Sequence, residues 1–341
     1  MRAAFESGLV MTRLLARIGF ALLVVLATSA HADDLRHDAV INGVRLTYWE
    51  SRPIQSNDVP VVYLHGGPGY NVYSFRKTAG AALAKTVPMV YLDERGSGAS
   101  ERPWTGDYSF PTIVQDIEGL RKALGVQRMV VMGHSFGGIL AAEYAAAYPD
   151  HVAKLILVDA AIDMPGALKA WVETFQQAYP DAYAKALGTA EGKALQATSA
   201  DEACQLSRAR FAFMGAALRL LPNSQAFRDL QQFHQHSALD EQKRLDSQSG
   251  YRNTGEIGTA LLSPGGSMVC YRVADPQTLS MPTLVIVGAY DRAVGVAPQK
   301  ALAAKLPRGR FVEFEQSAHF PYQEEPDGFQ REVLQFLSAS K

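Results

Sequence analysis

Ser135 lies within the sequence GHSFG at 133–137, which matches the pattern G-x-S-x-G. The motif follows an apolar run at 129–132 and precedes an alanine-rich stretch, so we expect it to form a turn between a strand and a helix. Such a turn would present Ser135 at the carboxyl edge of a sheet, and the helix N-terminus behind it would favour negative charge. The motif in this context predicts a nucleophilic serine.

A serine hydroxyl is a weak nucleophile unless a base takes its proton. In proteins with this turn, an acid and a histidine follow the serine in that order, each just past a later strand. Asp291 follows the expected strand at 283–287, and His319 follows the expected strand at 310–314. We expect His319 to act as general base and then acid, and Asp291 to fix its tautomer. Asp159, which follows an earlier strand, is the alternative acid.

The sequence HGGPG directly follows an expected strand at 59–64. Acyl transfer builds negative charge on an oxygen, which N–H donors placed in advance can stabilise. The backbone N–H of Phe136, directly after the serine, is one expected donor. The second should come from the glycine-rich loop, with Gly67 as the best candidate and Gly66 as the alternative. His65 is expected to brace this loop.

The elements that position these residues alternate between strands and helices, which predicts an α/β fold with a mostly parallel sheet and helices on both faces. The expected elements are a hairpin at 38–50, strands at 59–64, 89–92, 129–132 and 155–158, and a helix at 111–124. The alternation then stops, because 163–277 contains amphipathic helical stretches and no convincing strand. We therefore expect a helical cap inserted after the sixth strand, between core segments at 33–162 and 278–341.

Residues 1–32 differ in composition from the rest. Arginines precede an apolar run at 18–27, and Ala30 and Ala32 occupy the small-residue positions before a cleavage site. This pattern predicts a signal peptide cut between Ala32 and the aspartate that follows, and hence an exported, periplasmic protein. The apolar run is about half the length that spans a bilayer, so no stable membrane anchor is expected. Met11 is an alternative start, because the signal is complete from there.

Composition limits the remaining classes of function. The 341 residues include 33 basic and 34 acidic side chains, and this balance gives no indication of a nucleic-acid partner. The two cysteines, Cys204 and Cys270, could form one disulfide or stay as separate thiols. They do not make a metal site, and no cofactor is expected.

Five segments together resemble the prolyl aminopeptidase (proline iminopeptidase) branch of the α/β hydrolases, peptidase family S33. They are HGGPG at 65–69, LDERGSG at 92–98, GHSFGG at 133–138, GAYD at 288–291 and SAHF at 317–320. The resemblance implies a triad of Ser135, Asp291 and His319, with N–H groups of Gly67 and Phe136 as the oxyanion hole. It also implies action on short peptides.

One position departs from that family. Its members hold the substrate ammonium with glutamates, one in the cap and one directly after the triad aspartate, but here Arg292 follows Asp291. A cation there would repel an ammonium group. Glu256 is the best candidate for a remaining cap glutamate. Arg292 favours a neutral or anionic substrate, so a carboxylesterase or lactonase is the alternative, and a non-catalytic binding protein on the same fold is a third possibility.

Overall fold

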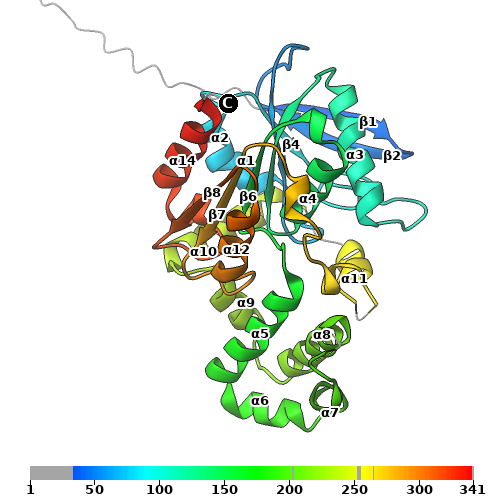
Figure 1. The fold of residues 1–341 in the computed structure, drawn as a ribbon, viewed down its shortest axis with the longest axis vertical. Coiled ribbons are helices and arrows are strands. Elements are labelled where there is room, and N and C mark those ends of the chain that lie inside the picture. The colour runs from blue at the N-terminus through cyan, green and yellow to red at the C-terminus, as the bar shows by residue number, and fades with distance from the viewer. Residues whose placement is uncertain (1–33, 202, 252–254, 264, 340–341) are drawn as a thin grey trace, which may run out of the picture. The chain divides into compact units, whose positions relative to one another are not determined.

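The computed structural model describes residues 34–201, 203–251, 255–263 and 265–339, and its centre is one eight-stranded sheet (Figure 1). The order across the sheet is β1-β2-β4-β3-β5-β6-β7-β8. The strands are β1 (Leu35–Ile41), β2 (Val44–Glu50), β3 (Val61–Leu64), β4 (Met89–Leu92), β5 (Met129–His134), β6 (Val152–Val158), β7 (Thr283–Gly288) and β8 (Gly309–Phe314). The six strands β3 to β8 run parallel to one another. β2 is antiparallel to both of its neighbours, β1 and β4.

The hairpin expected from the sequence is present as β1 and β2, and it turns at Asn42 and Gly43. Their φ angles are +48° and +75°, which is the left-handed backbone that a two-residue hairpin turn requires. β2 then pairs with β4 and continues the sheet. The hairpin therefore extends one edge of the parallel core.

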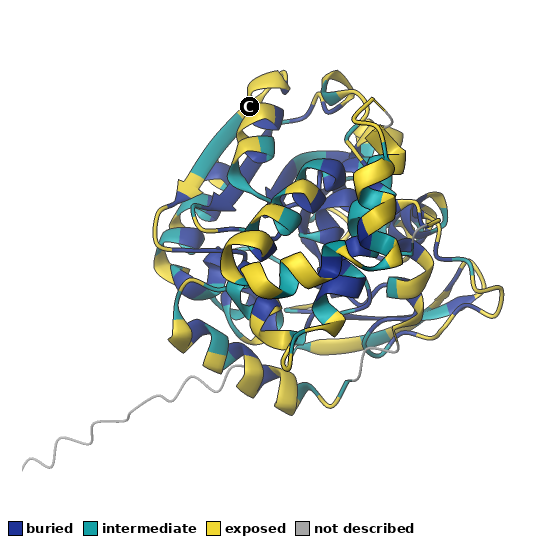
Figure 2. Ribbon diagram, turned by 90° about the horizontal axis from the view of Figure 1, so that it is seen from below, coloured by how far each residue is buried: buried dark blue, intermediate teal, exposed yellow. Residues whose placement is uncertain are grey.

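Helices cover both faces of the sheet. One face packs against α3 (Phe110–Ala123), α4 (Phe136–Ala147) and α12 (Val296–Lys305), and the other against α1 (Tyr73–Lys77), α2 (Ala79–Leu83) and α14 (Pro326–Ser338). Successive residues of a strand face opposite sides, so Val62 and Leu64 join the first layer while Val61 and Tyr63 join the second. Figure 2 shows the buried strands at the centre and the exposed outer sides of the helices. The α/β class expected from the sequence is confirmed.

A group of helices is inserted in the chain between β6 and β7, which are themselves neighbours in the sheet (Figure 1). They are α5 (Met164–Ala178), α6 (Pro180–Leu187), α7 (Ala190–Ala197), α8 (Ala203–Arg219), α9 (Gln225–Gln232), α10 (His236–Ser249) and α11 (Glu256–Leu261). Phe175, Phe213 and Phe227 form a separate apolar core among them. An isolated bridge between Asp163 and Arg272 joins the two ends of the insertion. The helical insertion after the sixth strand agrees with the expected fold class. The boundaries of the cap at 163–277 stay a prediction.

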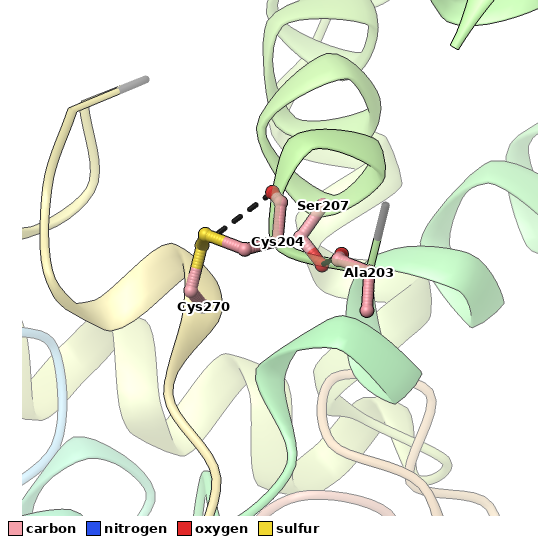
Figure 3. Close-up of a disulfide and its surroundings, with 4 residues drawn as sticks. All are labelled: Ala203, Cys204, Ser207 and Cys270. Carbon is pink, nitrogen blue, oxygen red and sulfur yellow. Dashed lines mark hydrogen bonds between the residues drawn. A yellow bond between two sulfur atoms is a disulfide. The ribbon is translucent and has the colours of Figure 1, made fainter. Parts of the chain in front are cut away.

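Cys204 and Cys270 form a disulfide with an S–S distance of 1.99 Å (Figure 3). Cys204 lies in the first turn of α8, and Cys270 lies in a short 3-10 helix, Met268–Cys270. The bond joins positions 66 residues apart in the chain. Of the two alternatives that the sequence left open, the structure contains the disulfide.

The predicted signal peptide at 1–32 lies outside the described residues. Within the described ranges, none of the helices combines the length and apolar character needed to cross a membrane.

Candidate active site

Ser135 occupies the tight turn between β5 and α4. Its φ and ψ are +53° and −116°, a backbone conformation that is strained for a residue with a side chain. Backbone hydrogen bonds hold it there: its N–H donates to the carbonyl of Val158 at 3.0 Å, and its carbonyl accepts from the N–H groups of Ala161 at 2.9 Å and Gly138 at 3.0 Å. The neighbouring strand β6 and the chain after it therefore fix the position of Ser135.

The motif around Ser135 requires glycine at positions 133 and 137, because neighbouring backbone atoms leave no space for a Cβ. A Cβ at Gly137 would lie 2.3 Å from the carbonyl oxygen of Leu64, and one at Gly133 would lie 2.2 Å from the carbonyl oxygen of Gly137. Both obstacles are backbone atoms, which cannot move aside cheaply. The helix can therefore start directly behind Ser135 only with glycine at these places.

His319 and Asp291 meet as the sequence predicted. Nδ1 of His319 lies 2.9 Å from Oδ2 of Asp291, and both side chains are buried. The other oxygen, Oδ1, accepts the backbone N–H groups of Ala293 at 2.6 Å and Val294 at 3.0 Å. Burial alone would raise the pKa of Asp291, but His319 and these donors lower it below its usual range, so the group is ionised. Nδ1 of His319 therefore donates, which leaves Nε2 as the ring's acceptor.

Ser135 and His319 line one cavity of about 170 Å³ together with Gly66 and Gly67, the two candidates for the second oxyanion donor. Gly66 packs directly on the serine, because a Cβ placed on it would lie 3.1 Å from Cβ of Ser135. Gly67 has a φ of +124°, which favours glycine. Phe136 is buried and begins α4. The remaining lining residues are Tyr70, His134, Gln232, Gln242, Asp246 and Phe320.

His65 and Glu94 form a buried pair beneath the glycine-rich loop. Nε2 of His65 lies 2.5 Å from Oε2 of Glu94, and neither side chain is exposed. Oε1 of Glu94 accepts the backbone N–H of His65 at 3.1 Å. Burial disfavours the charged ring, but the carboxylate of Glu94 outweighs it and raises the pKa of His65. The sequence did not predict the role of Glu94, although it lies in the LDERGSG segment.

His134 supports the loop that carries His319. Its Nε2 donates to the carbonyl of His319 at 2.8 Å, and its ring centroid lies 4.8 Å from that of His319. Burial and the nearby His319 lower the pKa of His134 to about 3, so its ring is neutral at physiological pH. It therefore fixes the loop without adding charge to the cavity.

Glu324, from the short helix α13 (Pro321–Glu324), joins the same loop to the cap. Its Oε2 accepts the N–H of Ala318 at 2.6 Å, and its Oε1 accepts the N–H groups of His234 and Gln235, each at 2.7 Å. The backbone N–H of His319 in turn donates to the carbonyl of Gln232 at 2.9 Å. The role of Glu324 was not predictable from the sequence, because its partners in the cap become neighbours only through folding.

One carboxylate faces the cavity from the cap. Oδ1 of Asp246, in α10, accepts from Nε2 of Gln242 at 2.8 Å and contacts the hydroxyl of Tyr70. Burial raises the pKa of Asp246, while hydrogen bonds from Tyr70 and Gln242 oppose this rise. Asp246 was not predictable from the sequence, because its partner Tyr70 lies 176 residues away in the chain.

The two residues predicted to bind substrate lie outside this lining. Arg292 lines a different hollow, beside α9 and α10, and its guanidinium points to the carbonyl of Leu230 at 3.4 Å. Glu256 is half exposed and pairs with Arg102 at 2.8 Å and with the hydroxyl of Tyr108 at 3.1 Å. Neither side chain is among the lining residues of the Ser135 cavity, and their predicted role in substrate binding stays a prediction. The sequence gives the positions of these two residues along the chain, but tertiary packing sets the direction in which their side chains point.

Asp159, Asp291 and His319 are the one set of potential metal ligands found in the described part of the chain, with ligand atoms within 4.8 Å of one another. The lone pairs of Asp291 already accept three N–H groups, and Nδ1 of His319 carries the proton that it donates. The set therefore fits a hydrogen-bonded unit better than a metal site.

Comparison with known proteins agrees with this architecture. Residues 59–326 match the family model described as the alpha/beta hydrolase fold. A proline iminopeptidase of Heyndrickxia coagulans is 27% identical over 289 residues, which cover 82% of this chain and 91% of the relative. One of Saccharolobus solfataricus is 26% identical over 295 residues, which cover 85% of this chain and 88% of the relative.

A solved structure supports the fold alone. The proline iminopeptidase-related protein of Thermus thermophilus superposes with a TM-score of 0.71 at 20% identity, covering 90% of this chain and 98% of that one. The family model spans most of the chain, from β3 to the start of α14, and includes the turn at Ser135 and the loops of Asp291 and His319. This protein therefore belongs to the alpha/beta hydrolase fold family, and proline iminopeptidases are among its relatives.

Proposed function

We propose that this protein is an exported serine aminopeptidase that removes an N-terminal residue, proline above all, from short peptides. The observation that carries the proposal is that Ser135 and His319 line one cavity while Asp291 holds His319 from behind. The relatives named proline iminopeptidase support the same activity. A carboxylesterase or lactonase is the second candidate, because the same three groups can cleave esters.

In the proposed reaction, Oγ of Ser135 attacks the carbonyl carbon of the scissile bond while Nε2 of His319 takes the hydroxyl proton. Asp291 stabilises the imidazolium that forms. The backbone N–H groups of Gly67 and Phe136 donate hydrogen bonds to the developing oxyanion. His319 then gives its proton to the leaving amine, and water, activated by the same ring, hydrolyses the acyl-enzyme on Ser135.

Asp246 supports a substrate with a free amine. It is the carboxylate that lines the cavity, and an ionised carboxylate is a natural partner for an ammonium group. Arg292 lines another hollow, so its guanidinium is not in contact with an amine bound in this cavity. A cavity of about 170 Å³ suits one small side chain such as the proline ring. These features favour the aminopeptidase over the esterase.

The nucleophile is tested with a fluorophosphonate probe on purified protein. The wild type should be labelled, and Ser135→Ala should not. Ser237→Ala, an exposed serine at the start of α10, is the matched control and should be labelled like the wild type. Failure of the folded wild type to react would exclude serine catalysis.

The substrate class is tested with proline β-naphthylamide, p-nitrophenyl butyrate and a small lactone. Asp246→Asn should lower kcat/KM for the proline amide about 10- to 100-fold, since a hydrogen bond to a charged group contributes roughly 1.5–3 kcal/mol. It should change ester hydrolysis little. Glu241→Gln is the matched control, because this exposed glutamate on the same helix pairs with Arg244. Faster turnover of esters than of the proline amide would favour the second candidate.

Export is proposed from residues 1–32, and the disulfide supports it, because such bonds persist in oxidising compartments. Expression of the full chain in a Gram-negative host should release the protein from the periplasm. N-terminal sequencing should start at the residue after Ala32. Recovery of the uncut chain in the cytosol would contradict the proposal.

A further inference from the structure

Asp159 is a fully buried carboxylate directly behind the Asp291–His319 pair. It follows the last residue of β6 and has a φ of +41°, unusual for a residue with a side chain. Its Oδ1 accepts the backbone N–H of Gly288 at 2.9 Å. A polar atom from each of Asp159, Asp291 and His319 lies within 4.8 Å of the other two. The pair therefore has a third polar neighbour that the proposed reaction does not use.

The two aspartates receive unequal numbers of donors. Asp291 accepts N–H groups of His319, Ala293 and Val294. Asp159 accepts one, and its Oδ2 is buried with no N–H or hydroxyl donor among the described residues. Two adjacent carboxylates that are both buried are strongly disfavoured from being ionised together. The negative charge belongs on the residue with more donors, which leaves the proton on Asp159.

We propose that Asp159 stays protonated at neutral pH and donates its hydroxyl hydrogen to Asp291, acting as a positioning residue for the proposed triad. This inference rests on the proposed function. A neutral donor holds the Asp291 carboxylate in place toward His319. A second negative charge there would instead stabilise the protonated ring, which cannot take a proton from Ser135.

The charged and titratable groups around Asp159 also favour its protonated form. Besides Asp291 and His319, the described titratable groups that interact electrostatically with Asp159 include Glu324 and Tyr322. Burial, reinforced by the charge of Asp291, raises the pKa of Asp159 well above its usual value. None of these neighbours is a lysine or arginine that would stabilise a second carboxylate.

The test compares Asp159→Asn with Asp159→Leu. Asparagine keeps an acceptor for Gly288 and a donor for Asp291, whereas leucine has similar volume and neither. We expect Asp159→Asn to keep fluorophosphonate labelling and proline amide turnover within about threefold of the wild type. We expect Asp159→Leu to lose at least about tenfold in both, the value of one hydrogen bond to a charged group. Loss in the asparagine variant as large as in the leucine variant, or full activity of the leucine variant, would overturn the proposal.

An infrared measurement decides the point if the leucine variant does not fold. The wild type minus Asp159→Asn difference spectrum at pH 7 should contain the C=O stretching band of one protonated carboxylic acid. Its replacement by carboxylate bands would overturn the proposal. The labelling rate separates this inference from the function itself. An unreactive wild type contradicts the function, while a reactive wild type with equal losses in both variants contradicts only the role of Asp159.

Discussion

Nε2 of His65 and Oε2 of Glu94 lie 2.5 Å apart, and neither side chain is exposed to solvent. Glu94 also holds the backbone N–H of His65, so one carboxylate fixes both the start of the glycine-rich loop and its side chain. Nδ1 of His65 donates to the carbonyl of Gly66 at 2.8 Å. Glu94 is therefore connected through two hydrogen-bonded steps to the loop that should stabilise the oxyanion.

Glu94→Gln should lower kcat about 10- to 100-fold with little change in KM. Glutamine would remove the carboxylate charge that favours the protonated ring of His65, so the loop should shift, and complete loss of an oxyanion donor costs about 10²–10³ in kcat. Steady-state kinetics on the proline amide measure the effect. Glu50→Gln is the control, because Glu50 pairs with His37 at 3.6 Å in the hairpin at the sheet edge. Wild-type kcat in a folded Glu94→Gln variant would show that the pair does not position the loop.

Glu324→Gln should lower kcat about tenfold for amides and esters alike. The new amide NH₂ would face N–H groups of either Ala318 or His234, and the resulting repulsion would loosen the loop of His319. Hydrogen exchange should become faster in residues 231–235 and 316–320. Glu332 lies on α14 and pairs with Arg310 of β8. Glu332→Gln removes this carboxylate and should leave both measurements unchanged. Slower turnover without faster exchange would argue against loosening of the loop.

Those features that depend on neighbours in sequence were predictable. Strand and helix signals located Ser135, Asp291 and His319 at element ends, and the glycines at 133 and 137 indicated a turn with no room for a Cβ. The hairpin turn at Asn42 was predictable for the same reason, because a left-handed backbone selects few residue types. Such constraints are satisfied locally and therefore remain visible in a single sequence.

The missed residues depend on contacts between distant segments. Tyr70 and Asp246 are 176 residues apart in the chain, yet they meet at the cavity. Their meeting depends on how α10 packs against the core, which no local pattern specifies. Arg292 shows the same limit, since the carbonyl at Leu230, at the end of a cap helix, directs its side chain away from Ser135. For this reason the sequence predicted the contact between Asp291 and His319 better than the other side chains that line the cavity.

The lowered pKa of Glu118 should make the free energy of unfolding depend on pH in the acid range. Burial alone would raise its pKa, but hydrogen bonds from Arg121 and Tyr144 lower it to about 2 in the folded protein, against an ordinary value of 4.5. A lowered pKa contributes stability above pH 4.5, and this contribution is lost as the pH falls from about 4.5 to 2. Glu118→Gln should therefore be less stable than the wild type at pH 7, by on the order of 2 kcal/mol.

Urea unfolding at several pH values tests this dependence. The difference between wild type and Glu118→Gln should be constant from about pH 7 to 5 and shrink below about pH 4.5. Glu173→Gln is the control, because Glu173 pairs with Lys169 only in an exposed helical turn at 3.7 Å. A difference that does not change with pH would mean that Glu118 stabilises the fold by packing rather than by its charge.

Reduction of the disulfide should destabilise the cap without removing the reactive serine. The bond joins positions 66 residues apart, and a crosslink of this span typically contributes about 2–4 kcal/mol, so dithiothreitol should lower Tm by roughly 5–10 °C. Neither cysteine lines the cavity of Ser135, so fluorophosphonate labelling at about 25 °C should continue. The double variant Cys204→Ser/Cys270→Ser should show the lower Tm with and without reductant. An unchanged Tm in wild type whose thiols have been shown to be free would mean that packing between α8 and the 3-10 helix holds this part of the cap without the bond.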